Sequence, residues 1–459
     1  MASTTPIATA EPCNALLFKE WLASHGGKFH PAVRYSCIPS GLSISASEDI
    51  EPDATIVTCP FSIVVTPLQS KRALLPILQD PSVLGRWTER QSIVVYICFH
   101  WVLSPEEIVS YDTLVHAPYL DTLPSPSQFR TPLYFTREEL EALRGTNLYG
   151  ATVDRRRDWE AEWEECRADV SGVNAEWGQG LTWCRFLTAS TYLSSRAFPS
   201  TLLSSPPSLV QRPDSYPVLI PGVDALNHAR AQPVSWIVTS TSTSTSTSST
   251  SSSSPSAATS ADSHGNDTTI SLVTHGACKA GAEIFNNYGP KPNSELLLGY
   301  GFTLSDNPDD TIVLKIGGHG AGDTEARHEV GRDARGAEAV WDAVVDAVRA
   351  QECQGLEEGE DEDEDEEEEE EAPEWQVVLD SADMLRSMTE SLSARLPTGV
   401  VPERGNSSVR GDVAEMIRQY VLGQRQVLQG LLRFASDREV GGVKMARREG
   451  TRIRSEGDA

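Results

Sequence analysis

The sequence lacks the cysteine spacing of a zinc site or of a disulfide framework. Its eight cysteines are scattered along 459 residues without a CxxC pair, which favours reduced thiols in an intracellular protein. No apolar run approaches the roughly 20 residues that cross a bilayer. Residues 1–12 also lack the basic-then-apolar pattern of a signal peptide. We therefore expect a soluble cytoplasmic or nuclear protein that holds no metal and contacts no membrane.

Positive charge is scarce: the chain has 38 lysines and arginines but 66 aspartates and glutamates, which gives a net charge of −28. Half of that net charge lies in residues 357–371, where fourteen of fifteen positions are acidic. Such a block repels itself and buries no apolar area, so we expect a disordered loop over 355–373. The rest of the chain is acidic too. This argues against nucleic-acid binding through phosphate neutralisation and favours a basic protein partner.

The chain is long enough for two or three domains, and a tract of serine and threonine interrupts it. Residues 239–259 are almost purely these two types, and no packed core can be built from them. We expect 239–267 to be a disordered loop between two strands. The first of these strands starts at Trp236, and the second covers 268–274.

Periodicity predicts short strands near the N-terminus and helices over much of the remainder. We expect an early helix over 14–26 and strands over 41–50, 55–60, 61–66, 283–287 and 309–316. Helical patterns cover 93–103, 137–143, 155–170, 183–198, 340–348, 377–396 and 413–432. The last twenty or so residues are polar, so we expect them to be frayed.

Residues 216–303 carry the strongest functional signal. An apolar segment ends in Asp224 and the pair Asn227-His228, Gly281-Ala282-Glu283-Ile284 leads to Tyr288-Gly289, and Tyr300-Gly301-Phe302 follows twelve residues after the first tyrosine. Each piece alone is typical of a turn or a strand end. Together and in this order, they resemble the core of a SET-domain methyltransferase.

The helical stretch after the first strands narrows this resemblance. Histone-type SET proteins lack so large an insertion and carry cysteine-rich zinc flanks, whereas this chain resembles the Rubisco large-subunit methyltransferase group. The resemblance implies an α+β fold: a knotted antiparallel β core with a large helical insertion and a separate all-α C-terminal domain. The implied parts are SET residues 14–68, the insertion 69–215, SET residues 216–303, and a helical substrate-binding-like domain over 304–459.

The same resemblance implies the site. It makes Tyr288 the catalytic residue, and it assigns S-adenosylmethionine to Ser40, Gly41, Leu42, Arg196, Asp224, Asn227, His228 and Asn293. It assigns the substrate to Tyr300, Phe302 and Trp236. Arginine suits the cofactor's carboxylate because its fork can donate two hydrogen bonds. Without the resemblance, Ser40 to Leu42 is an ordinary strand entry, and Arg196 is a cap of a helix C-terminus.

The implied reaction is methyl transfer to the ε-amine of a protein lysine, in a non-histone substrate such as a ribosomal or translation protein, by a monomer. A free lysine has a pKa near ~10.4, so an aromatic channel must favour its neutral form. Two alternatives stay open. One is transfer to a protein histidine, and the other is a catalytically silent SET-fold binding module.

Overall fold

The computed structural model describes residues 10–240, 268–316, 326–357, 372–398 and 409–451. The chain divides into two compact units, Met1–Phe129 with Arg155–Pro290 and Arg130–Asp154 with Lys291–Ala459. The first unit therefore groups the expected SET segment 14–68 and residues 216–290 of the expected SET segment 216–303 with most of the helical insertion. Residues 291–303 belong to the second unit. The two tracts expected to be disordered fall mainly on 241–267 and 358–371, which lie outside the described residues.

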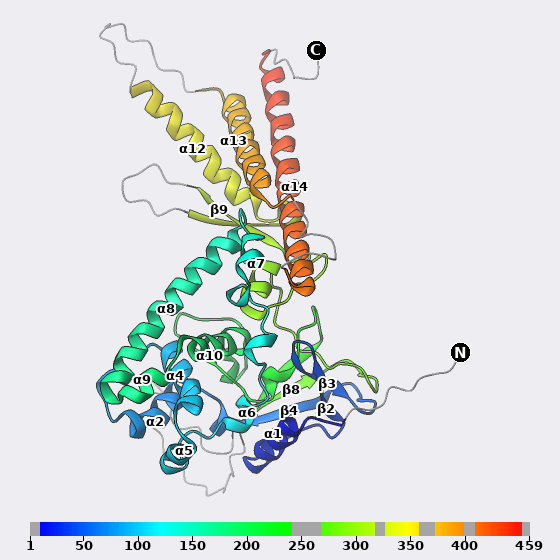
Figure 1. The fold of residues 1–459 in the computed structure, drawn as a ribbon. Coiled ribbons are helices and arrows are strands. Elements are labelled where there is room, and N and C mark those ends of the chain that lie inside the picture. The colour runs from blue at the N-terminus through cyan, green and yellow to red at the C-terminus, as the bar shows by residue number, and fades with distance from the viewer. Residues whose placement is uncertain (1–9, 241–267, 317–325, 358–371, 399–408, 452–459) are drawn as a thin grey trace, which may run out of the picture. The chain divides into compact units, whose positions relative to one another are not determined.

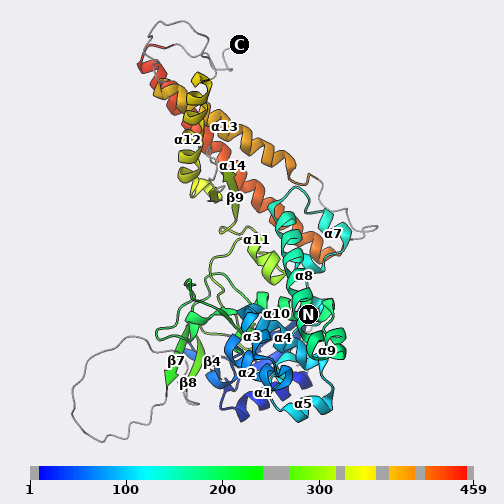
Figure 2. The same cartoon turned by 90° about the vertical axis from the view of Figure 1, so that its left-hand side faces the viewer.

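The strands of the first unit form small antiparallel sheets. They are β1 (Lys28–Phe29), β2 (Val33–Ile38), β3 (Gly41–Ala46), β4 (Ala54–Pro60), β5 (Phe198–Pro199), β6 (Pro217–Val218), β7 (Val234–Ser240) and β8 (Thr268–Thr274). A four-stranded sheet has the order β1-β4-β8-β7, and the pairs β2-β3 and β5-β6 complete the set. β7 is an edge strand beside β8, as Figure 2 shows.

Within this unit most helices lie to one side of the strands, whereas α1 lies beneath them in the view of Figure 1. They are α1 (Cys13–Ser24), α2 (Pro67–Leu78), α3 (Pro81–Arg86), α4 (Glu89–Val102), α5 (Pro105–Tyr111), α6 (Ala117–Leu120), α9 (Ala175–Gly180) and α10 (Trp183–Arg196). Single 3₁₀ turns are η1 (Phe61–Ile63), η2 (Pro126–Gln128), η4 (Ser200–Leu203) and η5 (Val223–Ala225). α8 (Asn147–Val173) begins in the second unit and continues into the first.

Local sequence accounts for where the main helices begin. Thr88 starts α4 with a capping box in which its side chain and that of Gln91 each satisfy a backbone N–H of the first turn. Ile93 to Phe99 are then buried on every side of the helix. Thr182 caps α10 with its side chain alone, which accepts from the Arg185 N–H. α10 is thus fixed at its start, and it ends at the arginine predicted to bind the cofactor.

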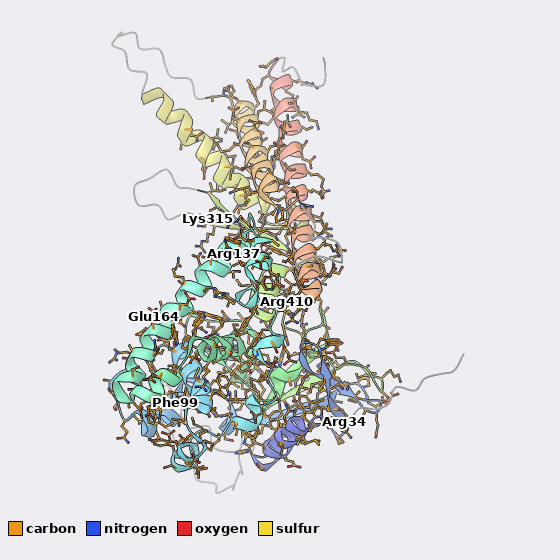
Figure 3. All side chains as sticks on the ribbon, viewed as in Figure 1. Arg34, Phe99, Arg137, Glu164, Lys315 and Arg410 are labelled. Atoms are coloured by element: carbon orange, nitrogen blue, oxygen red, sulfur yellow. The ribbon has the colours of Figure 1, made fainter. Side chains whose placement is uncertain are left out.

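The second unit is helical with one added hairpin. Its elements are η3 (Pro132–Tyr134), α7 (Arg137–Glu141), α11 (Asn293–Glu295), the π-turn η7 (Leu296–Tyr300), β9 (Thr311–Ile316), β10 (Ala326–Gly331), η8 (Arg332–Ala334), α12 (Ala337–Glu357), α13 (Glu374–Arg395) and α14 (Gly411–Arg448). α12, α13 and α14 lie side by side in both views (Figures 1 and 2). Arg410, the residue just before α14 (labelled in Figure 3), donates hydrogen bonds from Nε and Nη2 to the carboxylate of the buried Glu139, at 2.8 and 2.7 Å.

Three of the expected elements were wrong in type or extent. In place of the strand expected over 61–66, the chain leaves β4 at Pro60 and forms the 3₁₀ turn η1. Within 61–66, the one residue in a β-bridge is Val65, which pairs with Leu219. Residues 283–287 form isolated bridges rather than a strand. The fraying expected over the last twenty or so residues is wrong up to Arg448, where α14 ends. Residues 452–459 lie outside the described residues.

Small residues explain the length of α14. Ala435, Gly442 and Ala446 are buried along its C-terminal half, where no large apolar stripe signals a buried face. A Cβ at Gly442 would lie 2.9 Å from the side chain of Leu379 on α13, so the two helices approach closely there. Among the described residues, no helix is long and apolar enough to span a membrane.

Candidate active site

Tyr288 and His228 are neighbours although sixty residues separate them in the chain. The Tyr288 backbone N–H donates to His228 Nδ1 at 3.0 Å, and the two rings stack with centroids 5.1 Å apart and planes at 27°. The Tyr288 hydroxyl donates to the carbonyl of Leu226 at 2.8 Å. Since Nδ1 accepts a hydrogen bond, a neutral His228 carries its proton on Nε2.

Backbone hydrogen bonds join the same two segments. Asn286 N–H donates to the Asn227 carbonyl at 2.8 Å, and Ala229 N–H donates to the Asn286 carbonyl at 2.9 Å. His228 and Asn286 form a parallel bridge. This short parallel pairing holds Asn227, His228 and Tyr288 in one fixed arrangement, so the predicted pair and the predicted catalytic tyrosine come together.

A carboxylate that the sequence predictions missed fixes the amide of Asn227. Glu283 Oε1 accepts hydrogen bonds from Asn227 Nδ2 at 2.7 Å and from the Ser43 hydroxyl at 2.6 Å. Ser43 lies on β3, and Ser45 on the same strand forms a bridge with Glu283. Glu283 therefore connects three segments of the site. Its place in the Gly-Ala-Glu-Ile motif was the only sequence signal for it.

Arg196 and Asp224 form a buried pair of opposite charge. Arg196 Nη1 donates a hydrogen bond to the backbone carbonyl of Asp224 at 2.9 Å and lies 3.9 Å from Oδ2 of the Asp224 carboxylate. Asp224 Oδ2 accepts from the Tyr119 hydroxyl at 2.5 Å, and Oδ1 accepts from the Gly222 N–H at 3.2 Å.

The electrostatics of this pair follow from burial and mutual attraction. Burial raises the pKa of Asp224, and the nearby Arg196 only partly opposes this. Burial alone would lower the pKa of Arg196, but the Asp224 charge and the surrounding phenols, Tyr288 among them, outweigh it and raise that pKa. Arg196 thus stays cationic, and it is electrostatically coupled to the predicted catalytic tyrosine.

A small pocket opens over this pair. Leu42, Arg196 and Asp224 line it together with Phe18, Tyr35, Tyr119, Thr122, Leu123, Gly222 and Ala225. Gly41, the residue before Leu42, has φ +129°, and a Cβ there would lie 3.0 Å from Pro124. Only glycine adopts this conformation readily. The pocket presents a cation, a carboxylate and backbone, a combination that suits a zwitterionic amino-acid group.

Two further predicted residues of the first unit lie outside this pocket. Ser40 is exposed in the turn between β2 and β3. Trp236 is half-buried on the edge strand β7 opposite Leu272, and its indole N–H has no hydrogen-bond partner among the described residues. Their assignments to cofactor and substrate stay predictions.

The remaining predicted residues belong to the second unit. Asn293 is fully buried, and its side chain bonds to both backbone groups of Leu304 and to the Asp310 carboxylate. Tyr300 and Phe302 pack edge to face with centroids 6.2 Å apart. These three assignments also stay predictions.

The chain was compared with protein families and with solved structures. No family model matches the chain. The SET domain of LSMT bound to lysine and AdoHcy superimposes with a TM-score of 0.67 and 18% identity, over 97% of this chain and 98% of that one. Rubisco LSMT bound to AdoMet gives a TM-score of 0.65 with 17% identity, over 98% and 99% of the two chains. The chain has the SET-domain fold.

Curated relatives are similar in sequence over part of their length. Ribosomal lysine N-methyltransferase set10 of Schizosaccharomyces pombe is 28% identical over 302 residues, covering 64% of this chain and 47% of the relative. Ribosomal lysine N-methyltransferase 1 of Saccharomyces cerevisiae is 28% identical over 231 residues, covering 43% of this chain and 34% of the relative. The chain therefore spans about half the length of set10 and about a third of the length of the Saccharomyces cerevisiae relative.

Proposed function

We propose that the protein is an S-adenosylmethionine-dependent protein-lysine N-methyltransferase that acts on a ribosomal or translation protein. The observation that carries the proposal is the joining of Tyr288 to Leu226 and His228 beside the Arg196–Asp224 pocket. The similarity to ribosomal lysine N-methyltransferases supports the substrate class, and the SET-domain fold of LSMT supports the cofactor.

The pocket residues fit the cofactor. Arg196 would hold the α-carboxylate, because a buried guanidinium is a strong and directional donor to that group. Asp224 would hold the α-ammonium. Asn227 and His228, fixed by Glu283 and by Tyr288, would position the remaining polar groups. When bound, S-adenosylmethionine supplies a methyl group on a sulfonium.

Tyr288 would act at the reacting atoms as an acceptor. Its hydroxyl proton points to the Leu226 carbonyl, so the phenol oxygen presents lone pairs. They can orient the lysine amine and contact the polarised hydrogens of the methyl group. The Tyr288 oxygen would hold the amine in its neutral form in line with the methyl group that the cofactor would supply, and the proton that the methylated amine gives up would pass to water.

Replacing Tyr288 by phenylalanine tests the mechanism. We expect turnover to fall by about 100-fold, as for the loss of one aligned polar group at a reacting centre, while affinity for S-adenosylhomocysteine stays near that of the parent protein. Turnover would be measured with labelled cofactor and affinity by calorimetry. Tyr111→Phe, a change on α5 away from these residues, is the control. Loss of cofactor binding in Tyr288→Phe would mean that the tyrosine is structural.

The acceptor is tested by mass spectrometry. The full chain and deuterated cofactor would be incubated with ribosomes and extract from cells that lack the gene, and labelled peptides would be sequenced. We expect the label on lysine. Label on an imidazole would make the enzyme a histidine methyltransferase. A folded protein that binds no cofactor would be a silent SET-fold module.

The proposal includes a cytoplasmic or nuclear location and action as a monomer, without nucleic-acid binding. The acidic composition supports the last point. Fluorescence microscopy of the tagged chain and sedimentation of the purified chain would check location and oligomeric state. A secreted or membrane-bound pool, or a stable dimer, would contradict these parts.

A further inference from the structure

One phenol of the pocket has a hydroxyl with no hydrogen-bond partner in the described part of the chain. Tyr35 lies on β2, is 3% exposed, and lines the pocket with Arg196 and Asp224. Its hydroxyl oxygen is buried and has no hydrogen-bond partner among the described residues. A buried polar group of this kind costs free energy, and native proteins retain few of them. The hydroxyl therefore calls for a group that enters the pocket.

Tyr119 is a matched contrast in the same pocket. The two tyrosines pack on the same ring, Phe18, with centroid distances of 6.3 Å for Tyr35 and 5.9 Å for Tyr119. The Tyr119 hydroxyl already donates to Asp224 at 2.5 Å. Packing of the ring alone therefore accounts for the aromatic part of Tyr35 but not for its hydroxyl.

We propose that Tyr35 is a cofactor-binding residue whose hydroxyl donates a hydrogen bond to the α-carboxylate of the cofactor's amino-acid group, beside Arg196. This inference rests on the proposed function and adds one residue to the predicted cofactor site. Neither the motifs nor the expected strand pattern singled out Tyr35, because its role depends on which side chains share the pocket.

The charges of the pocket favour the carboxylate over the ammonium. Burial, and then the negative charge of Asp224, raise the pKa of Tyr35 well above its usual value, so its hydroxyl keeps the proton and can donate. The Asp224 carboxylate is the natural partner of the ammonium. Arg196 can only donate hydrogen bonds, and the protonated Tyr35 hydroxyl has a proton to donate. A carboxylate can accept from both groups.

The experiment compares two ligands that differ only in that carboxylate. S-adenosylhomocysteine and its decarboxylated analogue would be titrated calorimetrically into the parent chain and into Tyr35→Phe. We expect Tyr35→Phe to bind S-adenosylhomocysteine about tenfold more weakly, as for a lost hydrogen bond to a charged group. Binding of the decarboxylated analogue should change less than twofold. The two ratios together locate the contact on the carboxylate.

Thermal unfolding without ligand separates binding from a structural role. Tyr35→Phe should unfold at the same temperature as the parent chain or higher, because the hydroxyl it loses has no partner. Tyr119→Phe, the matched control, should unfold at a lower temperature because Asp224 loses a donor.

Three results would overturn the inference: equal weakening of both ligands, no weakening of either, or a lower unfolding temperature for Tyr35→Phe. If the folded parent chain binds neither ligand, the proposed function fails first. If the parent chain binds S-adenosylhomocysteine and Tyr35→Phe binds it equally well, the proposed function stands and only the role of Tyr35 fails.

Discussion

Each compact unit contains a buried aspartate whose pKa burial raises, but the two have different surroundings. Asp224 in the first unit faces Arg196 and lines a pocket with Tyr35, whose hydroxyl has no hydrogen-bond partner in the part of the chain that the structure describes. Asp310 in the second unit is 1% exposed and accepts from the backbone and side chain of Asn293 at 2.7 and 3.1 Å. One carboxylate borders space for a ligand, and the other is enclosed by protein groups.

This difference is what we expect if Asp224 serves cofactor binding and Asp310 serves the fold. The Asn293 amide also closes on Leu304, accepting its N–H at 2.7 Å and donating to its carbonyl at 3.0 Å. Gly423 of α14 makes room for Asp310, since a Cβ there would lie 2.0 Å from Oδ2. The Asp310 cluster is thus saturated and tightly packed, whereas the Asp224 cluster holds unused hydrogen-bonding capacity.

The largest expected effect is that of Asp224→Ala. It leaves the Arg196 cation buried without its carboxylate and the Tyr119 hydroxyl without its acceptor. We expect the free energy of unfolding to fall by about 3 kcal/mol or more, the usual cost of breaking a buried pair, and cofactor binding to be lost. Urea unfolding without ligand measures the first effect. Asp158→Ala, at an exposed pair with Arg157, is the control, and equal stability of the two variants would contradict the comparison.

The next effect is a pH dependence from Asp310, whose pKa burial raises to about 6. Between its unfolded value near ~3.9 and about 6, the folded state holds a proton that the unfolded state has lost. Stability from this group is therefore present at low pH and is lost as pH rises through 6, by about 3 kcal/mol in total. Urea unfolding from pH 4 to 7 measures it.

Asp310→Asn is the control for this dependence. An amide cannot titrate in this range, so the variant should show a shallower fall in stability from pH 4 to 6 than the parent chain. Identical slopes for the two proteins would mean that Asp310 is already ionised in the fold at pH 4.

A smaller effect is expected for Asn293→Ala, which removes the bonds to Leu304 and leaves the Asp310 carboxylate with fewer donors. We expect a loss of about 2 kcal/mol in the free energy of unfolding, typical of an unsatisfied buried group. Affinity for S-adenosylhomocysteine should stay within twofold of the parent, because the side chain is saturated by protein. Weaker binding at unchanged stability would instead support the sequence-based assignment of Asn293 to the cofactor.

Sequence patterns were sufficient wherever a local signal matched a buried face. The strand expected over 268–274 agrees with β8, and the helix expected over 183–198 begins at Trp183, as α10 does. The helix expected over 93–103 instead begins at Glu89, because Thr88 provides a cap that the apolar pattern does not register. The pairing of Asn227-His228 with Tyr288 could be predicted only through the family resemblance, because its hydrogen bonds link residues about sixty positions apart.

The rest could not be predicted because it depends on contacts rather than on residue types. The contacts of Glu283 and the proposed role of Tyr35 appear only when β3, β2 and the pocket are assembled. The extension of α14 to Arg448 depends on small residues that pack closely on α13, which hydrophobic periodicity does not register. Asn293 could not be placed from the sequence either, since its hydrogen bonds go to Leu304 and Asp310, which follow it by eleven and seventeen positions.

The smallest expected effect concerns a carboxylate that remains in water. A hydrogen bond from Arg418 lowers the pKa of Glu415, opposite in direction to the shift at Asp310. Both side chains of this pair are nearly half exposed, so solvent and salt screen the attraction. We expect Arg418→Ala to change the free energy of unfolding by about 0.5 kcal/mol or less, and by less still in 1 M salt. A loss as large as that of Asn293→Ala would show that burial does not separate the two classes of carboxylate, and the contrast between Asp224, Asp310 and the surface pairs would then need another physical cause.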